Sequence, residues 1–180
     1  MRIILIGFMG VGKTTIGKII SKKLDLKFVD MDEYIEMVED KSISKIFEQY
    51  GEQYFRKIET KTLKELIKDD NIIIATGGGI VSKKENLDIL KKEKKVIFLD
   101  GNTQTILGHL TNEINKRPLL SSSSNIENTI TNLLNERYEK YKESSKIEIS
   151  VDNKNIDEVV SQILVYISWF MILLYSNECN

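Results

Sequence analysis

Short apolar runs alternate with longer stretches of helical periodicity along most of the chain. The runs are rich in β-branched residues, and the longer stretches repeat apolar residues every three or four positions. The runs that predict strands lie at residues 2–6, 27–30, 71–76, 95–99 and 146–151. Strands that alternate with helices form βαβ units around a parallel sheet. The pattern therefore predicts an α/β fold, a three-layer sandwich with helices on both faces of the sheet.

One internal segment, residues 111–125, breaks this alternation. It is polar, it holds the only proline of the chain, Pro118, and it contains a run of serines at 121–124. We expect this segment to be a mobile lid. Upstream, a short helix is predicted to begin after an N-cap at Ser42 and to end near Gly51. No repeat and no linker divides the chain, so a single domain is predicted over residues 1–167.

Residues 168–180 form an apolar extension of the last predicted helix. Earlier in that helix, the stripe expected to face the core comprises Ile156, Val159, Val160, Ile163, Leu164 and Ile167. The apolar run 163–175 is about 20 Å long as a helix, short of the ~30 Å bilayer core, so we expect no transmembrane span. The extension is expected to pack on its own domain, to mediate self-association of a monomeric catalytic unit, or to contact lipid.

The charge balance argues against a nucleic-acid-binding domain, and the cysteine content argues against a disulfide-bonded protein. The 26 basic and 27 acidic residues give a formal net charge of −1, unlike that of a typical nucleic-acid-binding domain. A small-molecule partner is expected instead. Cys179 is the only cysteine, so no intramolecular disulfide can form, in agreement with a reducing cytoplasm. The first predicted strand begins at residue 2 with no room for a signal peptide, and a cytoplasmic location is expected.

The strongest chemical signal is the segment Gly7-Phe8-Met9-Gly10-Val11-Gly12-Lys13-Thr14, which matches the phosphate-binding pattern G-x-x-x-x-G-K-[ST]. It lies directly after a predicted strand and before a predicted helix, which is the context that the pattern requires. Glycines let backbone N–H groups turn toward phosphate oxygens, Lys13 adds positive charge, and the Thr14 hydroxyl can bind Mg²⁺. The residues expected to bind nucleotide are Gly10, Val11, Gly12, Lys13, Thr14 and Thr15.

Two carboxylates, Asp30 and Asp32, stand where the second predicted strand ends. The carboxyl ends of parallel strands line the ligand crevice, so both acids are expected near the phosphates. There they can organise Mg²⁺ through water or accept a proton from an attacking hydroxyl. The alternative is that either residue caps the following helix. The third strand runs into glycines at 77–79, where the backbone can approach a ligand closely.

Two arginines stand out by their position. Arg137 falls on the apolar face of its helix, where a charge is costly unless paired, so it is expected to bind an anion. The alternative is a side chain whose stem packs while its guanidinium reaches water. Arg56 has Glu52 four residues before it and Glu59 three residues after it. A solvated intrahelical ion pair is therefore the simpler interpretation for Arg56.

Together these motifs resemble the shikimate kinase family over nearly the whole chain, to about Ile167. The segments that match the family's motifs lie at 7–14, 30–32, 51–59, 77–79 and 117–120, followed by Arg137. The resemblance implies a five-stranded parallel sheet of order 2-3-1-4-5. It also implies transfer of the γ-phosphate of ATP to the 3-hydroxyl of shikimate, a step in aromatic amino acid biosynthesis.

The resemblance also implies roles for single residues. Shikimate lies between Asp32, Arg56, Gly78, Gly79 and Arg137, and the two arginines bind its carboxylate. Asp32 binds the reacting hydroxyl and acts as its base, Lys13 acts on the β- and γ-phosphates, and Arg117 reaches the phosphates from the lid as an arginine finger. Mg²⁺ is bound by Thr14 and, through water, by Asp30. Asn153, in the loop on the adenine side, is expected to bind the nucleotide.

Two departures from the family concern adenine. Many relatives carry an arginine shortly before the lid that packs on the base, where this chain has Gly108-His109-Leu110-Thr111. The turn at 152–155 lacks a proline often found there. His109, the only histidine, could stack on adenine or be an ordinary surface residue. The selectivity for the nucleotide base is therefore left open.

Two other functions are compatible with the phosphate loop. One is another small P-loop kinase, acting on gluconate or a nucleoside monophosphate, because the phosphate loop alone does not name the acceptor. The other is a nucleotide-binding module without catalysis. The presence of Lys13, Thr14, Asp32 and Arg117 argues against the second, since a module that only binds has no physical need for all four.

Overall fold

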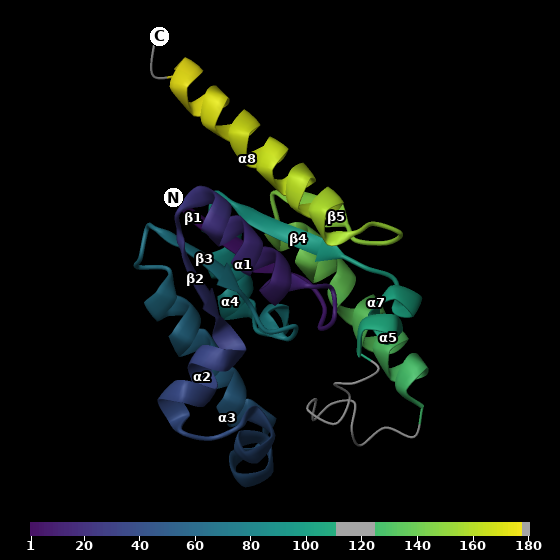
Figure 1. The fold of residues 1–180 in the computed structure, drawn as a ribbon. Coiled ribbons are helices and arrows are strands. Elements are labelled where there is room, and N and C mark those ends of the chain that lie inside the picture. The colour runs from purple at the N-terminus through teal and green to yellow at the C-terminus, as the bar shows by residue number, and fades with distance from the viewer. Residues whose placement is uncertain (111–124, 178–180) are drawn as a thin grey trace.

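The computed structural model of the chain is a sheet covered by helices on both faces (Figure 1). It describes residues 1–110 and 125–177, with the side chains of the last helix described as far as residue 170. The strands are β1 (Arg2–Ile6), β2 (Lys27–Asp30), β3 (Ile72–Ala75), β4 (Val96–Asp100) and β5 (Ile147–Ser150). The helices are α1 (Lys13–Leu24), α2 (Met31–Glu39), α3 (Ile43–Leu66), the 3-10 turn η1 (Ile80–Ser82), α4 (Lys84–Lys92), α5 (Thr103–Leu110), α7 (Ile126–Ser144) and α8 (Ile156–Asn177).

The five strands are parallel and lie in the order β2-β3-β1-β4-β5. The order and the three-layer fold class predicted from the sequence are therefore confirmed. The strand bounds agree with the predicted bounds to within one residue at each end. β1, at the centre of the sheet, is buried from Ile3 to Ile6 because helices cover both of its faces.

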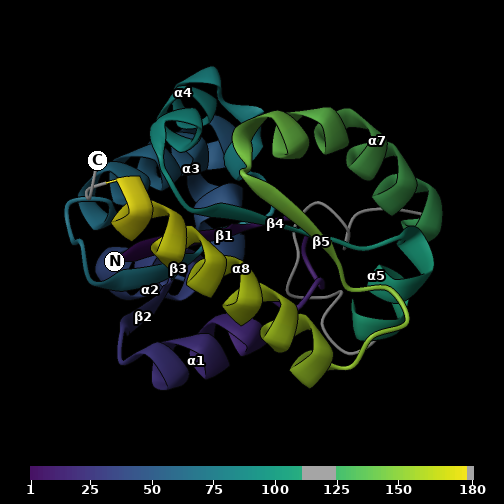
Figure 2. The same ribbon diagram turned by 90° about the horizontal axis from the view of Figure 1, so that it is seen from above.

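Alternate residues of β1 enter two different cores. Ile3 and Leu5 pack with α1 and α8, which lie side by side on one face of the sheet (Figure 2). Ile4 and Ile6 pack with residues of α3, α4 and α7 on the other face. A third, smaller cluster joins α2 to α3. The fold thus buries both faces of the sheet and leaves its carboxyl edge for a ligand.

The short helix predicted after Ser42 is the first part of α3. The Ser42 hydroxyl accepts a hydrogen bond from the backbone N–H of Lys45 at 3.3 Å, which makes Ser42 the N-cap. At Gly51 the backbone leaves the helical conformation, with φ 77° and ψ 170°. The predicted end is thus a kink, and the helix continues beyond it to Leu66.

The last helix, α8, begins beside the sheet and extends past the body of the domain (Figure 1). Most of its predicted core stripe is buried, namely Val159, Val160, Ile163 and Ile167. The prediction was wrong for Ile156, which is 46% exposed because it opens the helix at the rim of a cavity. Further along, Val165 and Trp169 are 70% and 61% exposed. None of the described helices has the length and apolarity that crossing a membrane would require.

Candidate active site

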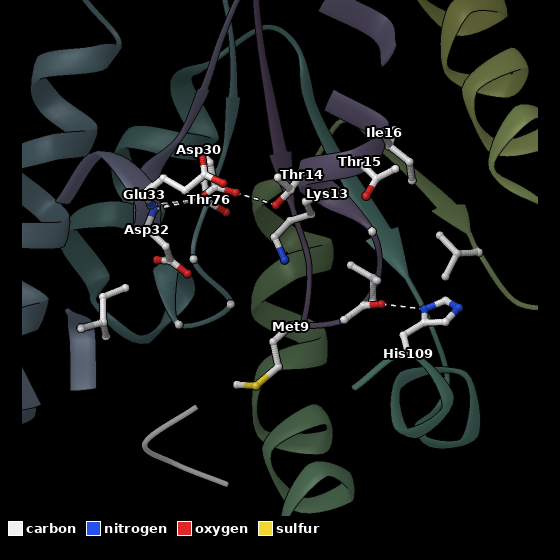
Figure 3. Close-up of a pocket in the computed structure, with 18 of the residues that line it drawn as sticks. Met9, Lys13, Thr14, Thr15, Ile16, Asp30, Asp32, Glu33, Thr76 and His109 are labelled. Atoms are coloured by element: carbon white, nitrogen blue, oxygen red, sulfur yellow. Dashed lines mark hydrogen bonds between the residues drawn. The ribbon is translucent and has the colours of Figure 1, made fainter. Parts of the chain in front are cut away.

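A cavity of about 940 Å³ lies where the carboxyl ends of β1, β2 and β3 meet (Figure 3). Open α/β folds bind their ligands at this edge of the sheet. The predicted site residues that line the cavity are Gly10, Val11, Gly12, Lys13, Thr14, Thr15, Asp30, Asp32, Arg56, Gly78, Gly79 and Arg137. Asn153 does not line it, although its neighbours Lys154 and Asn155 do. The predicted lid, including Arg117, lies outside the described residues except for Asn125, the N-cap of α7.

The loop between β1 and α1 wraps around part of the cavity. Gly10 and Gly12 have φ angles of 85° and 89°, a left-handed conformation that glycine adopts without strain. Gly12 is the N-cap of α1, and a helix N-terminus with no side-chain cap favours an anion. The Lys13 ammonium donates to the carbonyl oxygens of Gly7 and Phe8, each at 2.8 Å. The loop therefore offers the positive charge and helix terminus that phosphates require.

Asp30 and Asp32 take different places in the site (Figure 3). Asp30 caps α2, since its Oδ1 accepts from the N–H groups of Asp32 at 2.9 Å and Glu33 at 3.3 Å. Its Oδ2 accepts from the Thr14 hydroxyl at 2.5 Å. Asp32, in the first turn of α2, lines the cavity with its carboxylate against Gly77. The capping alternative therefore describes Asp30, while Asp32 is the candidate base.

Thr14 and Asp30 form a pair of oxygen ligands that suits Mg²⁺. This ion prefers hard oxygen ligands and usually keeps several waters, with only one or two ligands from the protein. The two oxygens lie 2.5 Å apart on the cavity wall. Residues 1–110 and 125–170 contain no cluster of three His, Cys, Asp or Glu side chains suited to a metal. A metal held here would therefore take its other ligands from water and phosphates.

The glycines after β3 form the wall between the loop and α7. The carbonyl oxygen of Gly78 accepts hydrogen bonds from Nη1 of Arg137 at 3.2 Å and from the hydroxyl of Tyr141. Burial raises the pKa of Tyr141, so its hydroxyl stays a donor. A side chain on Gly79 would lie 2.2 Å from the guanidinium of Arg56. Gly79 is thus needed because an arginine occupies the space that a side chain would fill, while a Cβ on Gly78 would lie 2.9 Å from the backbone nitrogen of Met9.

Arg137 is only 3% exposed, so its guanidinium does not reach water as the alternative interpretation required. Its guanidinium carbon lies 5.9 Å from the centre of the Phe8 ring. It forms no ion pair with the residues that the structure describes, and its buried Nε has no hydrogen-bond partner among them. A buried charge without a counterion is costly, so this arginine is suited to an anionic ligand.

Arg56 forms the predicted ion pairs, but the prediction that they are solvated was wrong. Its Nη1 lies 3.1 Å and 3.0 Å from the two carboxylate oxygens of Glu59, and its Nη2 lies 3.0 Å from Glu52. Arg56 is 7% and Glu59 1% exposed, because this face of α3 packs beneath Gly79 at the cavity wall. The sequence offered no sign of that burial, since the spacing of the charges is the same on a solvated helix.

Burial raises the pKa of Glu59 to about 7, although the charge of Arg56 lowers it, and the nearby Asp32 raises it further. Burial alone would lower the pKa of Arg56. The charges and hydrogen bonds of Glu59 and Glu52 together have the larger effect and raise it. The guanidinium therefore stays charged while the Glu59 carboxyl titrates near neutral pH. Sequence reasoning included Glu59 in a motif but assigned it no role.

The side of the cavity opposite these arginines is formed by α5 and the loop between β5 and α8. Asp152 accepts hydrogen bonds from the N–H of Asn102 at 3.0 Å and the hydroxyl of Thr105 at 2.6 Å. These bonds tie the loop to the start of α5. At the other end of α5, Nδ1 of His109 lies 2.7 Å from the carbonyl oxygen of Gly10 (Figure 3). Sequence reasoning did not foresee either connection, because both join residues distant in the chain.

Comparison with known proteins gives one consistent answer. A model of the shikimate kinase family matches residues 9–168. The shikimate kinase of Clostridium botulinum (strain Eklund 17B / Type B) is 48% identical over 162 residues, which cover 90% of this chain and 94% of that protein. The solved structure of the shikimate kinase from Acinetobacter baumannii in complex with shikimate superposes with a TM-score of 0.86 at 32% identity, covering 99% of this chain and 95% of that one.

The fold also extends to kinases with other acceptors. A gluconokinase from Sinorhizobium meliloti superposes with a TM-score of 0.59 at 13% identity, covering 98% of this chain and 96% of that one. So low an identity shows the fold alone. This likeness therefore gives no support to gluconate as the acceptor.

Proposed function

The chain belongs to the shikimate kinase family, and from this membership we propose that it transfers the γ-phosphate of ATP to the 3-hydroxyl of shikimate. The products are 3-phosphoshikimate and ADP. One observation supports shikimate as the acceptor. Arg56 and Arg137, both buried, line the same cavity as the phosphate-binding loop. Two buried guanidinium groups suit a carboxylate, which each can bind in a planar, charge-assisted arrangement.

In the proposed complex, shikimate occupies the part of the cavity bounded by Asp32, Arg56, Gly78, Gly79 and Arg137. Its carboxylate takes the position between the arginines, where it supplies the counterion that Arg137 lacks among the described residues. The reacting hydroxyl then faces Asp32, which lines the same cavity as the arginines and the phosphate loop. The absence of side chains at the two glycines lets the ring approach the backbone.

In the proposed mechanism, ATP binds with its phosphates on the loop and with its base toward α5. Asp32 accepts the proton of the 3-hydroxyl as that oxygen attacks the γ-phosphorus, and the bond to the β-phosphate oxygen breaks. Lys13 stabilises the charge that develops on the phosphates. Mg²⁺, when bound by Thr14 and through water by Asp30, would supply further neutralisation of that charge. The arginine-finger role of Arg117 stays a prediction.

Three broader statements are part of the proposal. Residues 1–167 act as one P-loop kinase domain with a lid at about 111–125, and residues 168–180 are an extension outside the site. The exposed Val165 and Trp169 are consistent with tail-mediated self-association of the catalytic unit. The reaction takes place in the cytoplasm, where ATP is available.

A coupled assay of ADP release tests the proposed function. Shikimate, gluconate and nucleoside monophosphates are compared as acceptors at equal concentration with Mg·ATP. We expect turnover with shikimate alone. Turnover with another acceptor and none with shikimate would contradict the assignment, and binding of ATP without turnover on any acceptor would favour the module without catalysis.

Removing either buried arginine is expected to weaken shikimate binding roughly a hundredfold, since each charge-assisted hydrogen bond contributes about 1.5–3 kcal/mol. The variants are Arg56→Gln and Arg137→Gln, which keep a polar end group on a shorter aliphatic stem and remove the charge. Calorimetric titration with shikimate measures the loss, and titration with ADP is expected to change little. Lys57→Gln, an exposed neighbour on α3, is the matched control. Unchanged shikimate affinity in both arginine variants would contradict the proposed carboxylate site.

Shikimate binding is expected to take up a proton at Glu59 near neutral pH. The free protein has a raised pKa of about 7 at this carboxyl, and an added anion beside Arg56 raises it further. Affinity is therefore gained as pH falls through 7, by about fivefold between pH 8 and pH 6 for a rise of about one pKa unit, while the shikimate carboxylate stays ionised.

Calorimetry in two buffers with different ionisation enthalpies measures this proton uptake directly. In Glu59→Gln the affinity is expected to be flat over the same range and the heat independent of the buffer. Proton uptake that persists in the variant would show that another group titrates.

A further inference from the structure

His109 connects the end of α5 to the phosphate-binding loop. Its Nδ1 lies 2.7 Å from the carbonyl oxygen of Gly10. A carbonyl oxygen can only accept a hydrogen bond, so Nδ1 carries a proton. In the neutral ring, the proton is therefore on Nδ1 and the lone pair on Nε2. The contact thus selects one of the two neutral tautomers.

The hydrogen bond is part of a packed contact between α5 and the loop. A Cβ added to Gly10 would lie 3.0 Å from Cγ of Leu110 and 3.4 Å from the carbonyl oxygen of Ile106. Leu110 and Ile106 are both buried in the core beneath the loop. At its start, α5 is held by the hydrogen bond from Thr105 to Asp152. The imidazole donor therefore stands on an element that is fixed at both ends.

The geometry of a peptide bond turns this contact into a constraint on the nucleotide site. The Gly10 carbonyl and the Val11 N–H belong to one planar peptide group, and the described chain contains no cis peptide bond. In a trans peptide these two groups point in opposite directions. Figure 3 shows His109 and the Lys13 amine on opposite sides of the loop. Holding the carbonyl toward His109 therefore turns the Val11 N–H toward the side on which Lys13 lies.

Without the hydrogen bond from His109, the orientation of the peptide that follows Gly10 would be poorly constrained. Gly10 has a φ of 85°, in a region where glycine has several accessible conformations of similar energy. Rotation of the peptide after Gly10 would replace an N–H group in the cradle with a carbonyl oxygen, which repels a phosphate. A donor that binds the Gly10 oxygen opposes this rotation.

We propose that His109 is a positioning residue of the nucleotide site. By donating from Nδ1 to Gly10, it holds the peptide between Gly10 and Val11 with its N–H facing the phosphates. This proposal rests on the nucleotide site of the proposed function but not on the identity of the acceptor. It gives the only histidine of the chain a role in binding phosphate that does not require it to touch the nucleotide.

The tautomer is measured by long-range ¹H–¹⁵N NMR on the ligand-free protein, where a single histidine gives a single imidazole spin system. At a pH where the ring is neutral, we expect a protonated Nδ1 and an unprotonated Nε2. The same state is expected after ADP is added. A proton on Nε2 instead would exclude the hydrogen bond to Gly10 and overturn the proposal.

Three substitutions test the effect on nucleotide binding. His109→Asn keeps an N–H donor near the position of Nδ1, His109→Gln moves the donor outward to about the position of Nε2, and His109→Ala has none. We expect the Kd for ADP with Mg²⁺ to rise about tenfold in the alanine and glutamine variants, the loss of one oriented hydrogen bond. The asparagine variant is expected to stay within about threefold of the original protein.

Equal ADP affinity in all four proteins would overturn the proposal, and so would an asparagine variant as weak as the alanine variant. The position is exposed, so thermal unfolding is expected to be unchanged and serves as the control for folding. These titrations contain no acceptor. A protein that binds ADP as expected but does not phosphorylate shikimate would contradict the proposed function and leave the role of His109 standing.

Discussion

Asp32→Asn is expected to lower kcat about a thousandfold, within the range that a general base contributes. The substitution keeps the size and polarity of the side chain but removes its capacity to take the proton of the attacking hydroxyl. Asp32 lines the cavity in the first turn of α2, on the side where Arg56 and Glu59 also lie. Coupled turnover assays with shikimate and Mg·ATP measure the loss, and the KM for ATP is expected to change little.

Glu33→Gln is the matched control, because Glu33 is the next acidic residue of α2, lines the same cavity and is exposed. We expect it to keep kcat within about twofold of the original, because Glu33 lines the cavity but takes no part in the proposed proton transfer. Near-original kcat in Asp32→Asn would exclude Asp32 as the base. A large loss of kcat in both variants would indicate that the rate depends on the total negative charge at this end of the cavity rather than on the carboxylate of Asp32 alone.

The fold was predictable because its determinants are local. Most of the strands are short runs rich in β-branched residues, and each turn at the carboxyl edge of the sheet is marked by glycine or aspartate. Alternation of such strands with helices leaves few arrangements other than a doubly covered parallel sheet. The resemblance to a known family then supplied the strand order, which local patterns do not contain.

The phosphate loop was predictable for the same reason, but the roles of the acids were not. Asp30 and Asp32 are equivalent by spacing, and only the backbone geometry makes Asp30 the cap that also accepts from Thr14. The burial of Arg56 beneath Gly79 depends on how α3 packs, which its sequence does not encode alone. Likewise, the contact of His109 with Gly10 joins residues 99 positions apart. Each of these depends on tertiary packing.

The interpretation of the last helix shows where periodicity misleads. Ile156 continues the apolar stripe of α8, yet it is exposed because it opens the helix at the rim of the cavity. Periodicity reports which face of a helix a residue occupies, but not whether another element covers that face at that point. The same limit applies to Val165 and Trp169, which lie on a face that no described element covers.

Lys13→Met is expected to lower kcat by roughly a hundredfold or more, as for removal of one preorganised donor from a developing charge. Methionine keeps an unbranched stem of similar length, so the packing along the loop is largely preserved. The effect is expected in kcat more than in ADP affinity, because negative charge on the transferred group and leaving oxygen is stabilised most in the transition state. Turnover assays measure the change in kcat, and ADP calorimetry measures the change in affinity.

The ground state of Lys13 makes this separation informative. Its ammonium donates to the carbonyls of Gly7 and Phe8, and these hydrogen bonds hold it on the phosphate-binding loop. The charge is thus positioned before the reaction, which is the condition under which it acts on the barrier. Lys22→Met, at an exposed position two turns further along α1, controls for the loss of one positive charge and is expected to keep full activity. If Lys13→Met lost ADP affinity and kcat in equal proportion, the lysine would act as a binding group rather than as a stabiliser of the transition state.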